Sequence, residues 1–273
     1  MVPYGNPQIS QIYLQDSKDY KVDVVVGADP LVAAFGSLSH DVIFAPINLG
    51  AKFYNVKDDY QLLGVVTWGN YYLISEQEIT LESIKNQTIH VFGQNQVPNM
   101  LMHIINEHYD LNLSFIYLDS LPTAASYASV HTNAIVLVSD PSYHMLLNDN
   151  DLFNGFNLND VYMDITGGNN LPQAGVFVKK DLSQDEKNRI KTDIIYSIQM
   201  LTDDTENALD KAISLGLTWD REILSTVFLS NQISFVSALD AKIDIEVFFQ
   251  YILSFQPMMI QNQLPNDLFY VGD

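Results

Sequence analysis

Hydrophobic residues gather in short runs along the first two thirds of the chain, and each run ends near a turn-forming residue. The runs are rich in β-branched and aromatic residues and do not alternate strictly with polar ones, which is typical of strands buried on both faces. We expect strands at residues 22–26, 41–45, 62–75, 88–92, 114–118 and 134–138. Helical patterns such as 98–109 lie between them, so the order of elements predicts an α/β fold with a doubly wound, parallel sheet.

Helices follow one another in the last third of the chain. Ser183 and Glu186 have the spacing of a capping box, and an apolar stripe of isoleucine and leucine residues continues from there to residue 201. Further helices are expected at 206–215, which stops before Gly216, and at 240–255, which stops before a proline. These helices should pack on the outside of the α/β core.

Two segments are candidates for connections between separate lobes. One is 62–75, which exceeds the usual strand length of about 5–6 residues. The other is the apolar run 173–178, just before the C-terminal helices. We therefore expect a discontinuous lobe 1, made of residues 1–72 and 172–273, and an inserted lobe 2, made of residues 73–171.

Composition excludes several classes of protein. The chain has 273 residues, of which 47% are hydrophobic and 17% charged, which indicates a globular protein rather than a disordered one. Its formal net charge of −20 repels nucleic acids, so no nucleic-acid partner is expected. The chain has no cysteine, which excludes disulfides, thiolate metal sites and cysteine nucleophiles. No apolar run reaches the length of a membrane helix, about 20 residues.

Motifs for catalysis or metal binding are not convincing. His103 and His108 are five residues apart, so they do not share a helix face as zinc ligands would. The segment 150–161 resembles a calcium loop, but Leu152 and Val161 occupy positions that require oxygen ligands. There is also no nucleophile elbow, phosphate-binding loop or dinucleotide fingerprint. We therefore expect no metal, no cofactor and no enzymatic activity.

Loops rich in amide and aromatic side chains follow the expected strands. They are residues 4–8, 46–48, 67–70, 93–96, 140–143 and 167–170. Asparagine and glutamine donate and accept hydrogen bonds without carrying charge, and tryptophan and tyrosine offer flat faces for stacking. In an α/β sheet such loops lie where ligands bind. The pattern therefore predicts a site that binds a small molecule without transforming it.

Several stretches carry a resemblance to a known family. They include "VPYGNPQIS", "DVIFAPINLGAKFY", "LGVVTWGNYYLIS", "TLESIKNQTIHVFG" and "QAGVFVKKDL", in this order. In these residues the chain resembles the type 2 periplasmic-binding-protein superfamily, in the branch that contains solute-binding proteins of ABC importers for nitrate, sulfonates and the pyrimidine precursor of thiamine. The resemblance covers nearly the whole chain.

This resemblance implies two α/β lobes joined by two crossing strands, with extra C-terminal helices and a solute held in the cleft. It also implies a monomer that closes on its solute, docks on a membrane permease and works outside the cytoplasm, as a periplasmic protein or a cell-surface lipoprotein. The chain shows neither the signal sequence nor the lipidated cysteine usual in the family, so we expect it to start in the mature region. The implied ligand-binding residues are Tyr4, Asn6, Pro46, Ile47, Asn48, Trp68, Asn70, Gln94, Asn95, Gln96, Asp140 and Tyr143.

The loops contain no lysine or arginine, which bears on the class of solute. Pockets for nitrate or sulfonate usually present a cationic side chain. We therefore expect a flat, neutral or weakly cationic heteroaromatic solute, similar to the thiamine pyrimidine, with Trp68 and Tyr4 stacking on it. Three alternatives stay open. They are a binding protein for nitrate or sulfonate anions, an enzyme on the same fold that acts on a small metabolite, and a surface protein that has lost transport and serves as an adhesin or sensor.

Overall fold

The fold is described from a computed structural model of the protein, which describes residues 1–272. Contacts divide the chain into two compact units. Unit 1 contains Met1–Trp68, Pro172–Leu253 and Pro257–Asp273, and unit 2 contains Gly69–Leu171 and Ser254–Gln256. The chain thus passes from unit 1 into unit 2 after Trp68 and returns after Leu171. We describe each unit by itself.

Unit 1 is built on a four-stranded sheet in which each pair of neighbouring strands is antiparallel. The sheet has the order β11-β4-β10-β3, and a short pair β1-β2 lies beside it. The strands are β1 (Val2–Pro3), β2 (Val24–Val25), β3 (Val42–Pro46), β4 (Tyr60–Trp68), β10 (Pro172–Lys179) and β11 (Ile233–Ser237). Because β10 is antiparallel to both β3 and β4, those two strands run in the same direction.

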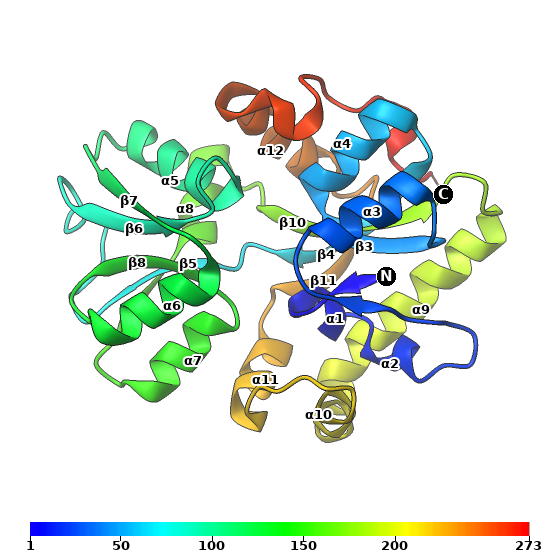
Figure 1. Ribbon diagram of the computed structural model, residues 1–273, viewed down its shortest axis with the longest axis horizontal. Helices are drawn as coiled ribbons and strands as arrows, with labels where there is room; N and C mark the ends of the chain where they lie inside the picture. The colour runs from blue at the N-terminus through cyan, green and yellow to red at the C-terminus, as the bar shows by residue number, and fades with distance from the viewer. Residues whose placement is uncertain (273) are drawn as a thin grey trace. The chain divides into compact units, whose positions relative to one another are not determined.

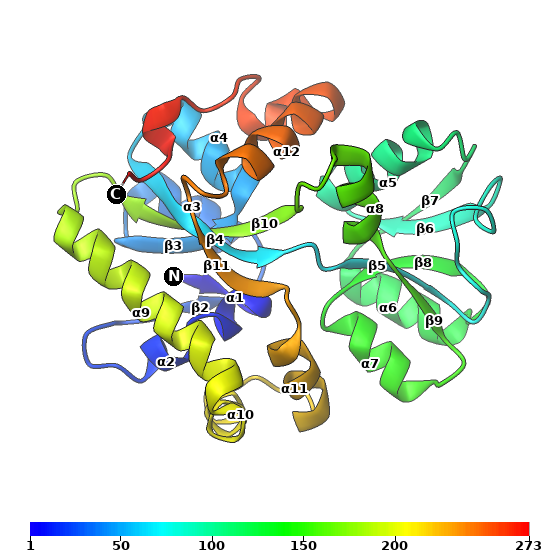
Figure 2. The ribbon, with the colours of Figure 1, turned by 180° about the vertical axis from the view of Figure 1, so that it is seen from behind.

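Helices cover both faces of this sheet (Figures 1 and 2). The helices of unit 1 are α1 (Asn6–Ile9), α2 (Ile12–Gln15), α3 (Asp29–Ser37), α4 (Ile47–Lys57), α9 (Gln184–Asp203), α10 (Thr205–Ser214), α11 (Arg221–Leu229) and, except for its last two residues, α12 (Lys242–Phe255), with 3₁₀ turns η1 (Pro257–Ile260) and η2 (Asp267–Phe269). Val176 and Leu63 pack with Ile194 of α9 on one face. On the other face Phe177 meets Phe35 of α3 and approaches Gly50 of α4. Successive residues of β10 therefore point to opposite layers of the core.

Unit 2 contains a five-stranded sheet of mixed direction. Its order is β7-β6-β8-β5-β9, formed by β5 (Tyr71–Ser75), β6 (Thr88–Phe92), β7 (Ser114–Leu118), β8 (Ile135–Ser139) and β9 (Asn154–Asn157). β6 pairs in parallel with β7 and β8, whereas β5 is antiparallel to β8 and β9. Its helices are α5 (Val97–His108), α6 (Leu121–Val130), α7 (Ser142–Asp149) and α8 (Leu158–Thr166).

Several predicted elements are confirmed. β6 and β7 have the predicted bounds, and α5 begins and ends within one residue of the predicted helix 98–109. The capping box at the start of α9 is present, with the Ser183 hydroxyl accepting from the Glu186 amide and the Glu186 carboxylate accepting from the Ser183 amide. No helix within residues 1–272 is both long and apolar enough to cross a membrane.

Two predictions about the sheets were wrong. The run 62–75 is not one long strand, because it breaks at Gly69 and Asn70 into β4 and β5, which belong to different sheets. Neither sheet is the expected parallel one, since all neighbouring strands of the unit 1 sheet, including the unpredicted β11, are antiparallel and the unit 2 sheet is mixed. Apolar runs bounded by turn residues look the same whether their neighbours are parallel or antiparallel, so the pairing direction came only from the tertiary structure.

Candidate solute-binding residues

The C-terminal ends of β3 and β4 meet at one edge of the unit 1 sheet. Pro46 ends β3 and Trp68 ends β4, and both strands run in the same direction beside β10. β10 and β11 begin at this same edge, because Pro172 lies opposite Trp68 and Ile233 opposite Thr67. We call this the unit 1 strand edge.

β1 delivers the N-terminal loop to the same edge. The Phe44 amide donates to the Met1 carbonyl at 2.9 Å, and the Met1 amino group donates to the Val42 carbonyl at 2.9 Å. Met1 thus bonds to two residues of β3 that are two positions apart. This is the hydrogen-bond pattern of parallel strands, so β1 runs beside β3 in the same direction. Counting forward from this register, Tyr4 comes level with Pro46, and Asn6 follows at the strand edge.

The Tyr4 side chain is held by a loop that the sequence did not single out. Its hydroxyl lies 3.2 Å from the Thr218 hydroxyl and also accepts from the Thr218 amide at 3.4 Å. Its ring packs edge-on against Trp219, with 5.6 Å between centroids. About a third of Tyr4, 36%, stays exposed. Trp219 lies between α10 and α11 and is a second aromatic candidate at this edge.

Asn6 is the most unusual polar residue at the unit 1 strand edge. It is only 3% exposed, and neither the nitrogen nor the oxygen of its side-chain amide has a hydrogen-bond partner within residues 1–272. The amide nitrogen of Gln173 is also buried and without a partner in the same range. Gln173 lies where the register between β10 and β4 shifts, beside the end of β3. A buried amide without a partner costs about 1–3 kcal/mol, so these two residues need an explanation.

Pro46, Ile47 and Asn48 form the turn from β3 into α4. Pro46 precedes the first turn of α4 with φ −51° and ψ 135°, and no side chain caps this helix end. Pro46 is exposed, Ile47 is fully buried, and Asn48 is half-buried. Of the three, Ile47 therefore contributes to the core of unit 1, whereas Pro46 and Asn48 present surface at the strand edge.

Trp68 is largely committed to packing within unit 1. Trp68 is only 6% exposed, and its indole N–H donates to the Ser234 carbonyl at 3.1 Å. The expected stacking role of Trp68 thus requires a ligand to reach a residue that presents little surface here.

In unit 2, Asn70 and Asp140 are direct neighbours. The Asp140 amide donates to the Asn70 carbonyl at 3.1 Å. This contact arises because β5 is antiparallel to β8, with Tyr71 opposite Ser139, so that β5 begins where β8 ends. The loop after β6, residues 93–96, leaves the sheet at the same end because β6 and β8 are parallel. Asn70, Gln94, Asn95, Gln96, Asp140 and Tyr143 therefore gather at one edge of this sheet, the unit 2 strand edge.

The loop from β6 into α5 presents amide side chains beside a helix end. Gln94, Asn95 and Gln96 are exposed, and Asn95 adopts a left-handed backbone with φ 60°. The Asn95 amide donates to the buried Asn99 side chain at 3.1 Å, which fixes the loop. No side chain caps α5, and Pro98 in its first turn has no N–H to donate.

Asp140 supplies a carboxylate at the unit 2 strand edge. Its side chain is fully buried, and His144 Nε2 lies 3.3 Å from its Oδ1. Burial lowers the pKa of His144, which favours the neutral imidazole. Burial also raises the pKa of Tyr143, with the charge of Asp140 adding to it.

One face of the Tyr143 ring is already occupied. It stacks on Tyr72 with 3.8 Å between centroids and an interplanar angle of 3°. A side chain at Gly155 would collide with the Tyr143 hydroxyl, so glycine makes room for this ring. Tyr143 therefore has at most its other face and its edge available for a ligand.

Metal-binding chemistry is not represented in the part of the chain that the structure describes. Residues 1–272 contain no group of three or more His, Asp or Glu side chains arranged to hold a metal ion. Gln173 and Trp219 are the residues that sequence reasoning missed. Trp219 could have been noticed as one of only two tryptophans in the chain, whereas nothing in the sequence marks Gln173 as partnerless.

Comparisons with known proteins give structural but not sequence matches. No family model matches the chain, and no curated protein matches it. An ABC transporter protein from Parabacteroides distasonis has a TM-score of 0.85 at 18% identity, covering 99% of this chain and 97% of that one. The periplasmic aliphatic sulphonate binding protein SsuA from Escherichia coli has a TM-score of 0.71 at 12% identity, with coverages of 100% and 93%.

A third structure is the ligand-binding component of an ABC-type import system from Staphylococcus aureus, with zinc bound. Its TM-score is 0.63 at 13% identity, covering 98% of this chain and 96% of that one. At these identities the likeness concerns the fold, and it extends over nearly the whole of each chain. This protein has the α/β fold of the periplasmic binding proteins of ABC transporters.

Proposed function

We propose that the protein is the solute-binding protein of an ABC importer, working outside the cytoplasm and passing a small molecule unchanged to a membrane permease. The solute that fits best is flat, neutral or weakly cationic, and heteroaromatic, such as an aminopyrimidine related to thiamine. The fold it shares with transport-associated binding proteins supports the general role. The nature of the strand-edge residues supports the class of solute.

The observation that carries the proposal is the buried side-chain amide of Asn6, which has no hydrogen-bond partner within residues 1–272. An Asn side chain offers two donors and an acceptor, and the heteroatom edge of an aminopyrimidine offers the complementary set. A solute that satisfies both Asn6 atoms would remove the cost of burying them. The side-chain nitrogen of Gln173 adds a donor at the same edge that has no partner in the described part of the chain.

Charge at the two strand edges favours a solute without negative charge. None of the candidate residues is a lysine or arginine, and Asp140 contributes a carboxylate. The two arginines lie on helices of unit 1, where Arg221 pairs with Glu206 and Asp210 and Arg189 lies over the Tyr20 ring. An anion would thus meet amides alone, against an overall charge of −20.

Each unit carries its own set of candidate contacts, and the mechanism we propose is closure of the lobes on the solute. Contacts that form only when the lobes close would shift the population toward the closed form. Small-angle scattering should then show a smaller radius of gyration when the solute is added. An unchanged radius at saturating solute would contradict the closure mechanism.

Isothermal titration with aminopyrimidines, taurine and nitrate tests the solute class. We expect binding of an aminopyrimidine at micromolar or lower concentration and none of the anions. Asp140→Asn, which keeps size and hydrogen bonding, should weaken a protonated aminopyrimidine more than a neutral one. Asp203→Asn, at the exposed C-terminal end of α9, serves as the matched control. Tight binding of taurine alone would overturn the proposed class.

Anion binding is the second candidate, and one observation favours it. The first amides of α5 have no side-chain cap, and helix N-termini attract anions. The same titration separates the two candidates. An enzyme on this fold is the third, and mass spectrometry of an incubated ligand tests it, because a carrier returns the ligand unchanged whereas an enzyme does not.

A further inference from the structure

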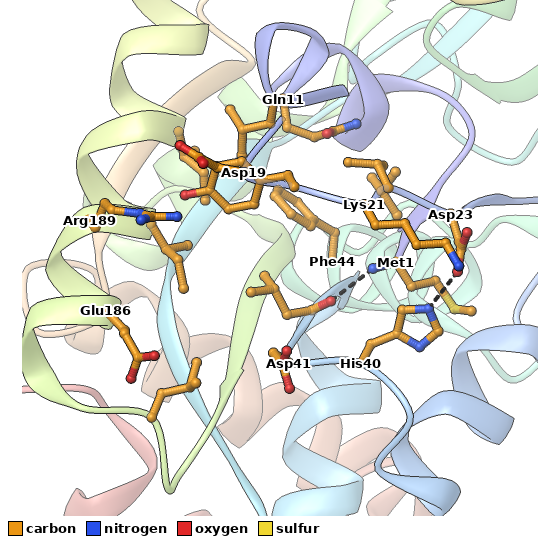
Figure 3. A pocket seen from close by; sticks show the side chains of 18 of the residues that line it. Met1, Gln11, Asp19, Lys21, Asp23, His40, Asp41, Phe44, Glu186 and Arg189 are labelled. Carbon is orange, nitrogen blue, oxygen red and sulfur yellow. Dashed lines mark hydrogen bonds and ion pairs between the residues drawn. The ribbon is translucent and has the colours of Figure 1, made fainter. Parts of the chain in front are cut away.

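Unit 1 contains a cavity of about 550 Å³ that none of the candidate solute-binding residues lines. It lies at the beginning of β3, beside Asp41 and Val42, whereas the unit 1 strand edge lies at the other end of that strand. Figure 3 shows its walls, which come from residues 19–23, residues 39–42 and the first half of α9. Chemistry at this cavity would therefore be separate from capture of the solute.

Ser39, His40 and Asp23 line this cavity and form one chain of hydrogen bonds. The Ser39 hydroxyl lies 2.8 Å from Nδ1 of His40, and Nε2 of His40 lies 3.0 Å from the Asp23 carboxylate, a bond that Figure 3 shows. Ser39 and His40 lie between α3 and β3, whereas Asp23 lies just before β2. A serine, a histidine and a carboxylate joined in this order are the arrangement that activates a serine nucleophile.

The chemistry of the three groups fixes the direction of both bonds. An ionised carboxylate only accepts, so Nε2 of His40 carries the proton and donates to Asp23. Nδ1 then holds a lone pair and accepts from the Ser39 hydroxyl, as a general base must. The hydrogen bond from His40 lowers the pKa of Asp23, and the nearby charge of Lys21 adds to this effect, so the carboxylate stays ionised.

Backbone contacts hold the two segments that carry the chain of bonds. Leu38 ends α3 in the left-handed region, with φ 57° and ψ 32°, and turns the chain toward the cavity. The His40 carbonyl accepts from the Tyr60 hydroxyl at 2.6 Å, and the Asp23 carbonyl accepts from an amide of β1 at 3.0 Å. Ser39 itself is exposed, so its hydroxyl is accessible to a substrate.

The rest of the cavity suits an ester with an apolar acyl chain. Its floor is apolar and continuous with the core of unit 1, and is formed by Leu14, Phe44, Ile190 and Ile194. Lys21 also lines the cavity and extends toward the carboxylate of Asp23 (Figure 3). A positive charge near the nucleophile stabilises a carbonyl oxygen that becomes negative during attack.

We propose that Ser39, His40 and Asp23 hydrolyse a small carboxylic ester whose acyl chain lies on the apolar floor. Oγ of Ser39 attacks the carbonyl carbon of the ester while its proton passes to Nδ1 of His40. His40 then gives this proton to the departing alcohol, which leaves the acyl group on Ser39. Water loses a proton to Nδ1 and attacks this acyl group, and the Ser39 oxygen takes the proton as the carboxylic acid leaves. Asp23 accepts the Nε2 proton of His40 throughout.

The expectation of no enzymatic activity depended on short motifs in the sequence. Asp23 is 17 residues from His40, so no short motif contains this chain of bonds. The activity is independent of the proposed transport role, since an aminopyrimidine has no ester group to cleave.

Hydrolysis of p-nitrophenyl butyrate by the purified protein tests the proposal. The unaltered protein should release p-nitrophenol at least about tenfold faster than Ser39→Ala. The matched control is Ser37→Ala, which should keep the full rate. Its hydroxyl donates to the Ala33 carbonyl at 2.7 Å within α3 and does not line the cavity. Equal rates for the unaltered protein and Ser39→Ala would overturn the proposal.

A fluorophosphonate, which labels activated serines, gives a second readout that does not depend on turnover. Mass spectrometry of the digested protein should find the label on Ser39, and His40→Gln should abolish it. Labelling of other serines alone, or equal labelling in His40→Gln, would show that His40 does not activate Ser39 and would overturn the proposal.

Asp23 is a positioning residue, because it acts through His40. Asp23→Asn should lower kcat at least about tenfold and leave KM within about twofold, and Asp23→Glu should recover part of the loss. A change in KM alone would contradict this role. The acyl floor predicts that the butyrate ester reacts about tenfold faster than the acetate ester at equal low concentration. Equal rates for the two esters would contradict an acyl chain on this floor.

Discussion

The ring of Tyr4 meets the ring of Trp219 edge-on, with 5.6 Å between centroids and an interplanar angle of 75°. This contact joins the loop after β1 to the loop between α10 and α11. The two loops are more than two hundred residues apart in sequence. It also gives the unit 1 strand edge an aromatic pair that includes one partly exposed ring.

Ligand binding at this edge should change the fluorescence of Trp219. The chain has two tryptophans, and Trp68 is buried with its N–H bonded, so Trp219 is the better reporter. In the Trp68→Phe protein, an aminopyrimidine should shift or quench the remaining emission with the same midpoint as in calorimetry. Trp219→Phe should keep a ring beside Tyr4 and remove the fluorescence change. Binding without any change in Trp219 emission would place the solute elsewhere.

Asn6→Ala should separate binding from stability. Because the Asn6 amide has no partner within residues 1–272, its removal breaks no described side-chain hydrogen bond, and the free energy of unfolding should stay within about 1 kcal/mol or rise. Affinity for the solute should fall by about 10- to 100-fold if Asn6 contacts it. Denaturant unfolding and calorimetry measure the two quantities. The control is Asn207→Ala on α10, whose side chain is exposed and donates to the Asp204 carboxylate. Loss of stability with unchanged affinity would give Asn6 a structural role.

Two helical glycines should respond in opposite ways to alanine. A Cβ at Gly50 of α4 would lie 2.0 Å from the Phe177 ring, whereas one at Gly36 of α3 would meet nothing within 4 Å. Gly50→Ala should destabilise the protein by about 1–3 kcal/mol through overpacking. Gly36→Ala should stabilise it by about 0.5–1 kcal/mol through helix propensity. Thermal and urea unfolding compare the two variants directly, and a stable Gly50→Ala protein would contradict the close packing of α4 on β10.

Stability should depend on pH through the amino group of Met1. Burial lowers its pKa from 8.0 to about 6, while the nearby carboxylates of Asp23 and Asp41 oppose this shift. The unfolded chain then binds more protons than the folded one between these values, so stability rises as pH increases from 6 to 8. Two pKa units correspond to at most about 2.7 kcal/mol.

The control for this effect is the N-acetylated protein, which lacks the titrating group. Burial lowers the pKa of His144 from its usual value of 6.5 as well, so this residue also makes stability rise as pH increases. Acetylation leaves the contribution of His144 unchanged. The difference between the two proteins in urea unfolding at pH 6, 7 and 8 isolates the amino group. Equal pH profiles would show that the amino group is solvated in the folded protein.

Local patterns in the sequence determined those elements whose signals lie within a few residues. The S-x-x-E spacing predicted the capping box of α9, and the β-branched runs predicted β6, β7 and β10. The periodic Met and Ile residues after Pro98 predicted α5. The repetition of strand and helix predicted the α/β class, because hydrophobic periodicity reports local geometry directly.

Pairing between distant segments was decided only by the tertiary structure. β10 is inserted between β3 and β4, so two strands adjacent in sequence are separated by one from more than a hundred residues later. The expected loop 67–70 does contain the break at Gly69 and Asn70, but no local pattern shows that the strands on its two sides belong to different sheets. Asn6 likewise reads as an ordinary turn residue, and its partnerless burial follows from the long-range packing of α1 against β4 and β11. Sequence periodicity specifies which faces are buried, but the identity of the neighbour depends on contacts that no local pattern encodes.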